Sequence, residues 1–328
     1  MLVLFALLNI MKAEAPVDSR SFLSVCMSPT LQKILCFDEV MMDRVNRTAK
    51  HRLDVAGKGV NITRVLTQLG KKALHLTQLG GRLRPLFLDL CAAEALPLHW
   101  VESSSPIRFC YTLITGPSRD SPGTITELVE EASPVEPGTE DRLTEAYRRV
   151  LPDHSVVIIA GSKAAGFSDA LVPRMVREAK ALGRMVILDI RGPDLLNSLK
   201  FCPDVIKPNL LEFAQTFAPE LVAKNALTGD PVMMKNRIRE ICRDLCGEYR
   251  TRIVLTRGEE ALWYADLRGF SEFTPKPVKP VNTTGSGDAF TAGFAAALEE
   301  GASPEEAVAL GIRCGGLNAG LLQVGTIR

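Results

Sequence analysis

The stretch Thr283–Phe290 combines hydroxyls, two glycines and a carboxylate at a spacing that suits phosphoryl chemistry. Gly285 and Gly287 permit a tight turn and a bare backbone beside a ligand. From Asp288 onward, apolar residues recur at helical spacing, so the turn leads into a helix. The free N–H groups of such a helix start, together with the helix dipole, favour an anion. A carboxylate beside an anion site would take a proton from a hydroxyl that receives a phosphoryl group.

The same stretch also has a purely structural interpretation, because Gly-x-Gly followed by Asp can be an ordinary capped helix start. Two familiar phosphate motifs are excluded. The dinucleotide fingerprint needs a third glycine at the position of Phe290, and Gly-x-x-x-x-Gly-Lys-Ser/Thr occurs nowhere in the chain.

A second glycine loop precedes a helix in the N-terminal part of the chain. Gly57, Lys58 and Gly59 are followed by apolar residues at positions 62, 65, 66 and 69, which form one helical face. At such a helix start, Lys58 would supply a positive charge for a phosphate. The alternative is a flexible loop with a solvated lysine.

The elements that must position these loops alternate between strands and helices. Strands are predicted at 22–27, 73–79, 156–160, 185–189, 205–207 and 253–255, with helices near 168–182, 192–200 and 304–319. The continuous apolar runs predict buried parallel strands, and their alternation with helices indicates a doubly wound sheet with ligands at the carboxyl ends of the strands. Partly polar strands are predicted at 33–37, 45–55, 107–114 and 123–128.

The two glycine loops together resemble a known family. Thr-Thr-Gly-Ser-Gly-Asp-Ala-Phe at 283–290 resembles the C-terminal signature of the ribokinase-like (PfkB-type) carbohydrate kinases, and the segment 56–61 resembles their N-terminal Gly-Gly-Lys-Gly-x-Asn signature. The elements at 107–108 and 126–128 resemble those of the 1-phosphofructokinase and tagatose-6-phosphate kinase branch. The resemblance covers roughly residues 22–325. It implies an α/β fold with a doubly wound, mostly parallel sheet flanked by helices, and a small β-sheet lid with strands near 33–55 and 107–128.

The resemblance also implies roles for particular residues. Asp288 would be the catalytic base, with the amides of Gly285, Ser286 and Gly287 as the anion hole. The substrate would contact Gln32, Gly57, Lys58, Gly59, Asn61 and Arg108. ATP would contact Asn209, Thr256, Gly258, Thr284 and Asn318. Asn209 and Glu212 have the spacing of a capping box, and in the family this pair is also linked to Mg²⁺, directly or through water.

The expected activity is therefore ATP-dependent phosphorylation of a phosphorylated ketohexose, of the fructose 1-phosphate or tagatose 6-phosphate type. Gln32, Ala56 and Lys163-Ala164-Ala165 depart from the family pattern, and all lie on the sugar side. These departures leave two alternatives open: a kinase-fold sugar-binding protein with weak or no catalysis, or a ribose or nucleoside kinase. For Arg108, a surface ion pair is the alternative to a substrate phosphate.

Composition limits the class of partner. The 328 residues carry a net charge of +1 and are 46% hydrophobic, which argues against nucleic acid or a membrane surface. The eight cysteines are scattered and are expected to be reduced, so a cytoplasmic location is predicted. Residues 1–20 are expected to be a disordered extension, since the apolar run lacks the charged start of a signal peptide. Residues 21–328 would form the kinase domain, with a homodimer through the lid as the candidate assembly.

Overall fold

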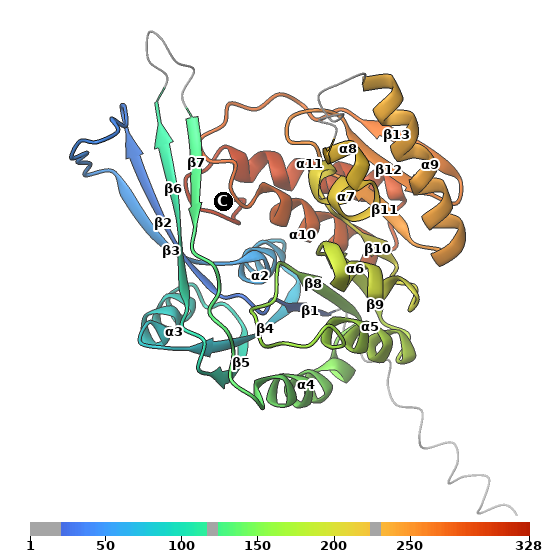
Figure 1. Ribbon diagram of the computed structural model, residues 1–328, viewed down its shortest axis with the longest axis horizontal. Coiled ribbons are helices and arrows are strands. Elements are labelled where there is room, and N and C mark those ends of the chain that lie inside the picture. The colour runs from blue at the N-terminus through green and yellow to red at the C-terminus, as the bar shows by residue number, and fades with distance from the viewer. Residues whose placement is uncertain (1–20, 117–123, 224–230) are drawn as a thin grey trace, which may run out of the picture.

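The computed structural model describes residues 21–116, 124–223 and 231–328, which form a nine-stranded sheet with a four-stranded sheet beside it (Figure 1). The extension predicted for residues 1–20 lies outside the described residues. In spatial order, the strands of the large sheet are β13 (Gly269–Phe273), β12 (Leu262–Asp266), β11 (Arg252–Leu255), β10 (Val205–Ile206), β9 (Met185–Asp189), β8 (Val156–Ala160), β1 (Ser21–Val25), β4 (Lys72–Gly80) and β5 (Leu98–Ser103).

The large sheet is parallel from β5 to β11, and only β12 and β13 run antiparallel at one edge. Strands β8 and β9 have the predicted bounds, because an uninterrupted apolar run can only be a strand that is buried on both faces. The predicted doubly wound, mostly parallel sheet is therefore confirmed. In the described part of the chain, no helix combines the length and apolarity needed to cross a membrane.

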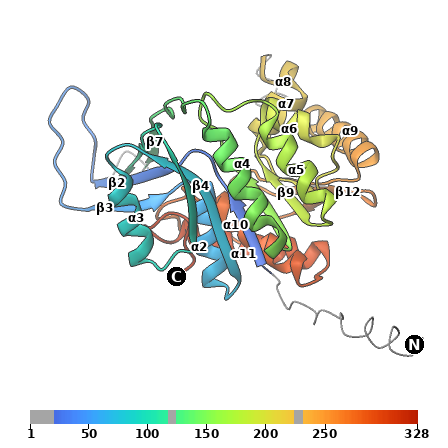
Figure 2. The ribbon, with the colours of Figure 1, turned by 90° about the horizontal axis from the view of Figure 1, so that it is seen from below.

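Helices cover both faces of the large sheet (Figure 2). They are α2 (Lys58–Gln68), α3 (Arg84–Ala93), α4 (Thr139–Val150), α5 (Leu171–Ala181), α6 (Gly192–Leu199), α7 (Leu210–Phe217), α8 (Pro219–Ala223), α9 (Pro231–Tyr249), α10 (Ser286–Glu299) and α11 (Pro304–Ala319), with a 3₁₀ turn at Leu151–Asp153. Successive residues of a strand point to opposite faces. Leu23 and Val25 thus pack with α4, α5, α6 and α9, whereas Phe22 packs with α2, α10 and α11.

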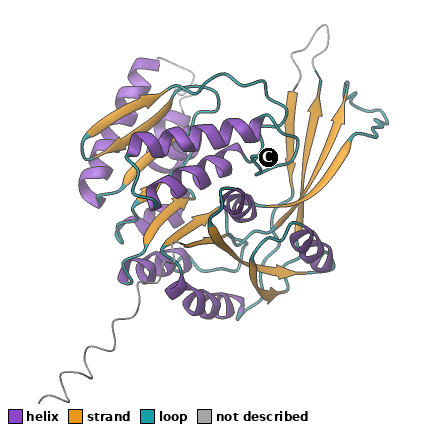
Figure 3. Ribbon diagram, turned by 180° about the vertical axis from the view of Figure 1, so that it is seen from behind, coloured by secondary structure: helices purple, strands orange, loops and turns teal. Residues whose placement is uncertain are grey.

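The small sheet is the predicted lid, and it stands apart from the layered body (Figure 3). Its strands in spatial order are β3 (His51–Ala56), β2 (Thr30–Phe37), β6 (Arg108–Thr115) and β7 (Thr124–Val129). β2 and β6 are parallel, and the outer pairs are antiparallel. Leu31 and Val55 of the lid pack onto Phe87 of α3, so a small core of its own joins the lid to the body.

One lid strand is shorter than predicted. The sequence predicts a strand over 45–55, but β3 begins only at His51. The side chain of Asn46 accepts a hydrogen bond from Met41 N and donates one to Met41 O, at 2.9 and 2.8 Å. These side-chain hydrogen bonds replace those that the backbone would form with a neighbouring strand, and the segment before β3 therefore forms a turn. The homodimer through the lid stays a prediction.

Candidate active site

A cavity of about 690 Å³ lies between the lid and the glycine turn at the start of α10. Gln32, Arg108 and Glu127 line it from the lid strands. A second cavity of about 800 Å³ shares part of this wall, including Lys58, and continues past the ends of β1, β8 and β9. Both cavities therefore lie at the carboxyl ends of parallel strands, where ligands of doubly wound sheets bind.

The glycine turn exposes backbone N–H groups to the first cavity. Gly285 has a φ of 82°, a left-handed conformation that favours glycine, and a Cβ there would lie 2.6 Å from Gly325 N. Ser286 differs from the prediction, because its N–H donates to Thr283 O at 3.1 Å and is used inside the turn. Within the described ranges, no backbone carbonyl accepts from Gly287 N–H. The glycine amides and the first turn of α10 are therefore the groups that could bind an anion here.

Asp288 is the buried carboxylate of this turn. Asp288 is 6% exposed. Its Oδ2 atom accepts a hydrogen bond from Asn61 Nδ2 at 2.7 Å. Burial raises the pKa of Asp288 to about 6; Lys58 opposes the rise, and Asp189 adds to it. A carboxylate with a pKa close to neutrality suits a general base that works near physiological pH.

Asp189, at the end of β9, holds two lysines at the floor of the site. Its Oδ1 lies 2.7 Å from Lys58 Nζ, and its Oδ2 lies 3.0 Å from Lys207 Nζ. Thr291 of α10 also donates to Oδ2 at 3.0 Å. Burial alone would raise the pKa of Asp189, but the two ammonium groups hold it below its usual value. Asp189 and Lys207 were not among the predicted site residues, although each is the last residue of a predicted parallel strand.

Lys58 is not the freely solvated loop lysine of the alternative interpretation. Burial would lower the pKa of Lys58, but the carboxylates of Asp189, Asp288 and Glu212 raise it above its ordinary value. The ammonium group therefore stays charged. It lines both cavities, where Asp189 fixes it, and its contact with a substrate phosphate stays a prediction.

The lid contributes polar groups from three strands. Gln32 Nε2 donates to Thr112 Oγ1 at 2.8 Å. Arg108 Nη1 donates to Glu130 O at 2.8 Å, and no carboxylate of the described residues lies within ion-pair distance of its guanidinium group. The surface ion pair considered for Arg108 is thus absent there. Thr284 Oγ1 donates to Glu127 Oε1 at 2.6 Å, which ties β7 to the glycine turn across the cavity.

Asn209 and Glu212 form the predicted capping box at the start of α7. Glu212 N–H donates to Asn209 Oδ1 at 2.8 Å, and Asn209 N–H donates to Glu212 Oε2 at 2.9 Å. The second carboxylate oxygen, Oε1, lies 4.0 Å from Lys58 Nζ on the cavity side. Thr256 pairs with Asn209 in an isolated β-bridge and lines the same cavity. In the described ranges, no cluster of three or more His, Cys, Asp or Glu side chains could enclose a metal ion.

Three predicted contact residues line neither cavity. A Cβ at Gly59 would lie 2.3 Å from His75 Cε1, so this glycine is needed for close packing. Asn318 is fully buried, and its Nδ2 donates to Thr284 O and Ser286 Oγ at 3.0 and 3.1 Å. It therefore braces the glycine turn from behind. Gly258, with a φ of 64°, forms the turn after β11.

Comparison with known proteins supports the same interpretation of the chain. Residues 31–326 match the family model described as pfkB family carbohydrate kinase. A tagatose-6-phosphate kinase of Staphylococcus epidermidis is 26% identical over 310 residues, which cover 93% of this chain and 94% of the relative.

Solved structures share the fold. Phosphofructokinase-2 from Escherichia coli in complex with fructose-6-phosphate matches with a TM-score of 0.79 and 21% identity, over 94% of this chain and 95% of that one. A possible 1-phosphofructokinase from Thermotoga maritima matches with a TM-score of 0.79 and 19% identity, over 92% and 93%. The doubly wound sheet with its lid is thus an arrangement that these proteins have in common.

Proposed function

Because the chain belongs to the pfkB family of carbohydrate kinases, we propose that it transfers the γ-phosphoryl group of ATP to a hydroxyl of a phosphorylated ketohexose. The observation that carries the proposal is the buried Asp288, which faces a cavity lined by the cations Lys58, Lys207 and Arg108. Arg108 donates only to neutral acceptors of the described residues, so its charge is available for a phosphate that an unphosphorylated sugar lacks. The names of the relatives, a tagatose-6-phosphate kinase and a phosphofructokinase bound to fructose-6-phosphate, support the same substrate class.

In the proposed mechanism, the carboxylate of Asp288 accepts the proton of the substrate hydroxyl as its oxygen attacks the γ-phosphoryl group. The amides of Gly285 and Gly287 stabilise the charge that develops on the transferred group, and Lys58 and Lys207 add two ammonium groups beside it. The lid closes over the substrate from the side of Gln32 and Arg108. Excluding water in this way favours transfer to the sugar over hydrolysis.

The site is suited to a magnesium ion that arrives with the nucleotide. The two cavities are lined by five cationic side chains and five carboxylates: Lys58, Arg108, Lys163, Arg191 and Lys207 against Glu127, Asp189, Asp194, Glu212 and Asp288. Their charges cancel, so the polyanionic triphosphate needs a further cation. Mg²⁺ would supply that charge when it is bound with the nucleotide, and such an ion needs few protein ligands. Glu212 Oε1, which the capping box leaves unused, is the oxygen that fits it.

Replacement of Glu212 by glutamine tests this metal role. Glutamine also completes a capping box, so the helix start is kept and only the charge is removed. We expect Glu212→Gln to raise the Mg²⁺ concentration for half-maximal activity several-fold. The matched control is Glu306→Gln, which changes the second capping box of the chain, at Ser303 and far from the cavities. A lower melting temperature with an unchanged Mg²⁺ profile would mean that Glu212 serves only as a cap.

Recognition of the substrate's own phosphate is tested at Arg108. Lys58 is a poor choice, because removing it also takes away one of the two lysines paired with Asp189, whereas Arg108 contacts only neutral acceptors of the described residues. A lost charge-assisted hydrogen bond of roughly 1.5–3 kcal/mol corresponds to about a 10- to 150-fold loss of affinity. Arg108→Gln should therefore raise KM for the best sugar phosphate by that factor and leave KM for ATP unchanged.

The measurement is a turnover screen with ATP and fructose 1-phosphate, fructose 6-phosphate, tagatose 6-phosphate, fructose, ribose and adenosine. Lys33→Gln is the control, since Lys33 is an exposed cation of lid strand β2 that lines neither cavity. If Arg108→Gln raised KM equally for phosphorylated and unphosphorylated sugars, Arg108 would not bind the phosphate. Preference of the wild type for ribose or adenosine would favour the alternative substrate class.

A further inference from the structure

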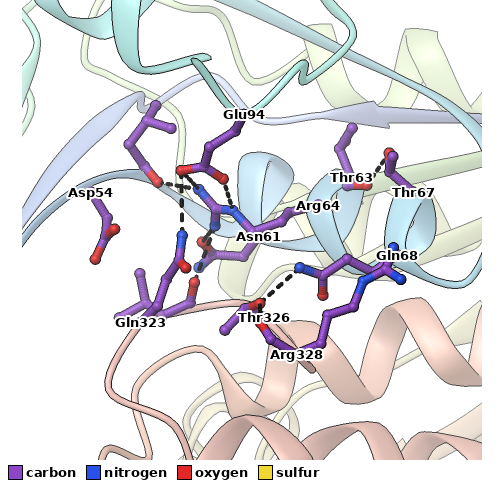
Figure 4. Close-up of polar contacts among 12 residues, drawn as sticks. Asp54, Asn61, Thr63, Arg64, Thr67, Gln68, Glu94, Gln323, Thr326 and Arg328 are labelled. Atoms are coloured by element: carbon purple, nitrogen blue, oxygen red, sulfur yellow. Dashed lines mark hydrogen bonds and ion pairs between the residues drawn. The ribbon is translucent and has the colours of Figure 1, made fainter. Parts of the chain in front are cut away.

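We propose that Arg64 is a positioning residue for the reaction: its guanidinium group fixes the amide of Asn61 so that this amide donates to Asp288. Arg64 and Asn61 both belong to helix α2, which follows the N-terminal glycine loop. Figure 4 shows the guanidinium group of Arg64 between Glu94 and Asn61. The inference rests on the proposed role of Asp288 as base and goes beyond it, because it assigns a task to a residue that touches neither cavity.

Arg64 is 2% exposed, and its donors are directed to separate acceptors. Nη1 donates to Asn61 Oδ1 at 3.2 Å and to Val324 O at 3.1 Å, and Nη2 donates to Val55 O at 2.7 Å. Nε forms the ion pair with Glu94 Oε2 at 2.5 Å. A planar guanidinium group can serve all these directions at once, and an ammonium group cannot. The residue therefore fixes a junction between α2, the lid and the segment near Val324.

The chemistry of arginine decides how the amide of Asn61 is oriented. Arginine has donors and no acceptor, so the atom of Asn61 that faces it must be the oxygen. The amide nitrogen then faces Asp288, where Nδ2 donates to Oδ2 at 2.7 Å. Positions 61 and 64 lie on the same face of α2, as residues three apart on a helix do. The ionised carboxylate of Asp288 accepts only, so Arg64 and Asp288 favour the same orientation of the amide from its two ends.

Gly325 holds the same side chain from the opposite side. A Cβ at Gly325 would lie 2.3, 2.4 and 2.5 Å from the Cβ, Cγ and Oδ1 atoms of Asn61. The φ of 57° also disfavours any other residue there. The neighbouring Gln323 donates to Glu94 Oε1 at 3.3 Å, so the segment 323–325 and Arg64 are joined through one carboxylate. Two independent contacts thus determine where Asn61 lies.

The consequence for Asp288 is electrostatic as well as geometric. Asp288 is faced by Lys58 and Asn61 of α2, by Asp189 after β9 and by Lys207 after β10. The hydrogen bond from Asn61 favours the ionised form and lowers the pKa of Asp288 against the effect of burial. It also occupies Oδ2, and no described residue donates to Oδ1, which is then the oxygen for the substrate proton. Loss of the Asn61 contact should raise the pKa of the base.

The test is the pH profile of kcat/KM between pH 5 and 9 for wild type, Arg64→Lys and Gly325→Ala. Both variants disturb Asn61, by different routes. We expect the apparent pKa of the acid limb to rise by about one pH unit, since a single hydrogen bond to a carboxylate shifts its pKa by that order. Because the wild-type base has a pKa of about 6, the rate at pH 6 then falls about fivefold, and most of it returns at pH 8.5. KM for ATP stays unchanged.

The matched control is Arg174→Lys, which alters a half-buried pair with Glu140 on the far face of the sheet and should leave the profile in place. A fall in rate that is equal at every pH, or an acid limb that does not move in either variant, would overturn the proposal. If Arg64→Lys fails to fold, Gly325→Ala decides alone, because it keeps the guanidinium group and its ion pair. Asp288→Asn tests the proposed base separately from the role of Arg64. Full activity in that variant would refute Asp288 as the base, and this inference with it.

Discussion

Replacing Asp288 with asparagine is expected to lower kcat by ~10²–10⁴-fold while ATP still binds, because the substitution keeps the shape of the side chain and removes its basicity. Gly285 and Gly287, which line the cavity beside Asp288, are not changed. The measurement is steady-state turnover of the best sugar phosphate together with a binding titration with ATP. A variant with near wild-type kcat would exclude Asp288 as the base, and a wild type without turnover would favour a sugar-binding protein.

The same variant should be more stable than the wild type in the absence of ligands. Folding raises the pKa of Asp288 from its ordinary value to about 6, so the carboxylate is destabilising once it ionises. A shift of about two pH units corresponds to at most roughly 3 kcal/mol of unfolding free energy. The stability that the protonated form provides is lost as the pH rises through 6. The melting temperature of Asp288→Asn should therefore exceed that of the wild type at pH 8, and the difference should be smaller at pH 5. The same difference in melting temperature at both pH values would contradict this prediction.

Replacing Asp189 with asparagine is expected to have the largest effect on stability. Asp189 is 1% exposed and pairs with two lysines, so its loss leaves two cations close together without the carboxylate that lies between them. Breaking a buried pair in this way costs about 3–5 kcal/mol. Because its pKa is lowered on folding, the carboxylate stabilises the fold at neutral pH, and this contribution is lost only as the pH falls through the lowered value. Denaturant unfolding at pH 7 measures the difference.

Two companion variants separate the ion pair from a general loss of charge. Asp169→Asn removes an exposed carboxylate that pairs with Lys163, and about 1 kcal/mol or less is expected there. Adding Lys58→Met to Asp189→Asn removes one of the two unpaired cations, so the double variant should be more stable than Asp189→Asn alone. If the two substitutions were simply additive, the buried charge would not be the cause.

Local patterns predicted the parts of the site that are local. The glycine turn before Asp288 and the loop around Lys58 consist of adjacent residues, and their composition specifies the backbone. The central strands β8 and β9 were also predicted from a local pattern, because burial on both faces gives a continuous apolar run. Edge strand β5 was not predicted, since only two of its residues are buried and its sequence includes the polar residues His99 and Glu102.

The partners that act from a distance could not be read from the sequence. Asp189 is 131 residues from Lys58 and 102 from Thr291, and no spacing links them. The rule that ligands bind at the carboxyl ends of parallel strands was the available signal for Asp189 and Lys207. The prediction that Asn318 contacts the nucleotide followed from the resemblance alone, and the structure places that residue behind the turn.

The large separation between the partners of Asp288 also determines when activity can first arise during synthesis. Asn61 and Asp288 are 227 residues apart, and Arg64 and Val324 are 260 apart. A ribosome adds residues from the N-terminus onward, and early segments begin to fold before late ones exist. The glycine loop at Lys58 is therefore made long before the carboxylate that it serves. An unfinished chain lacks both the base and the segment that orients Asn61, so it cannot consume ATP while it is still being translated.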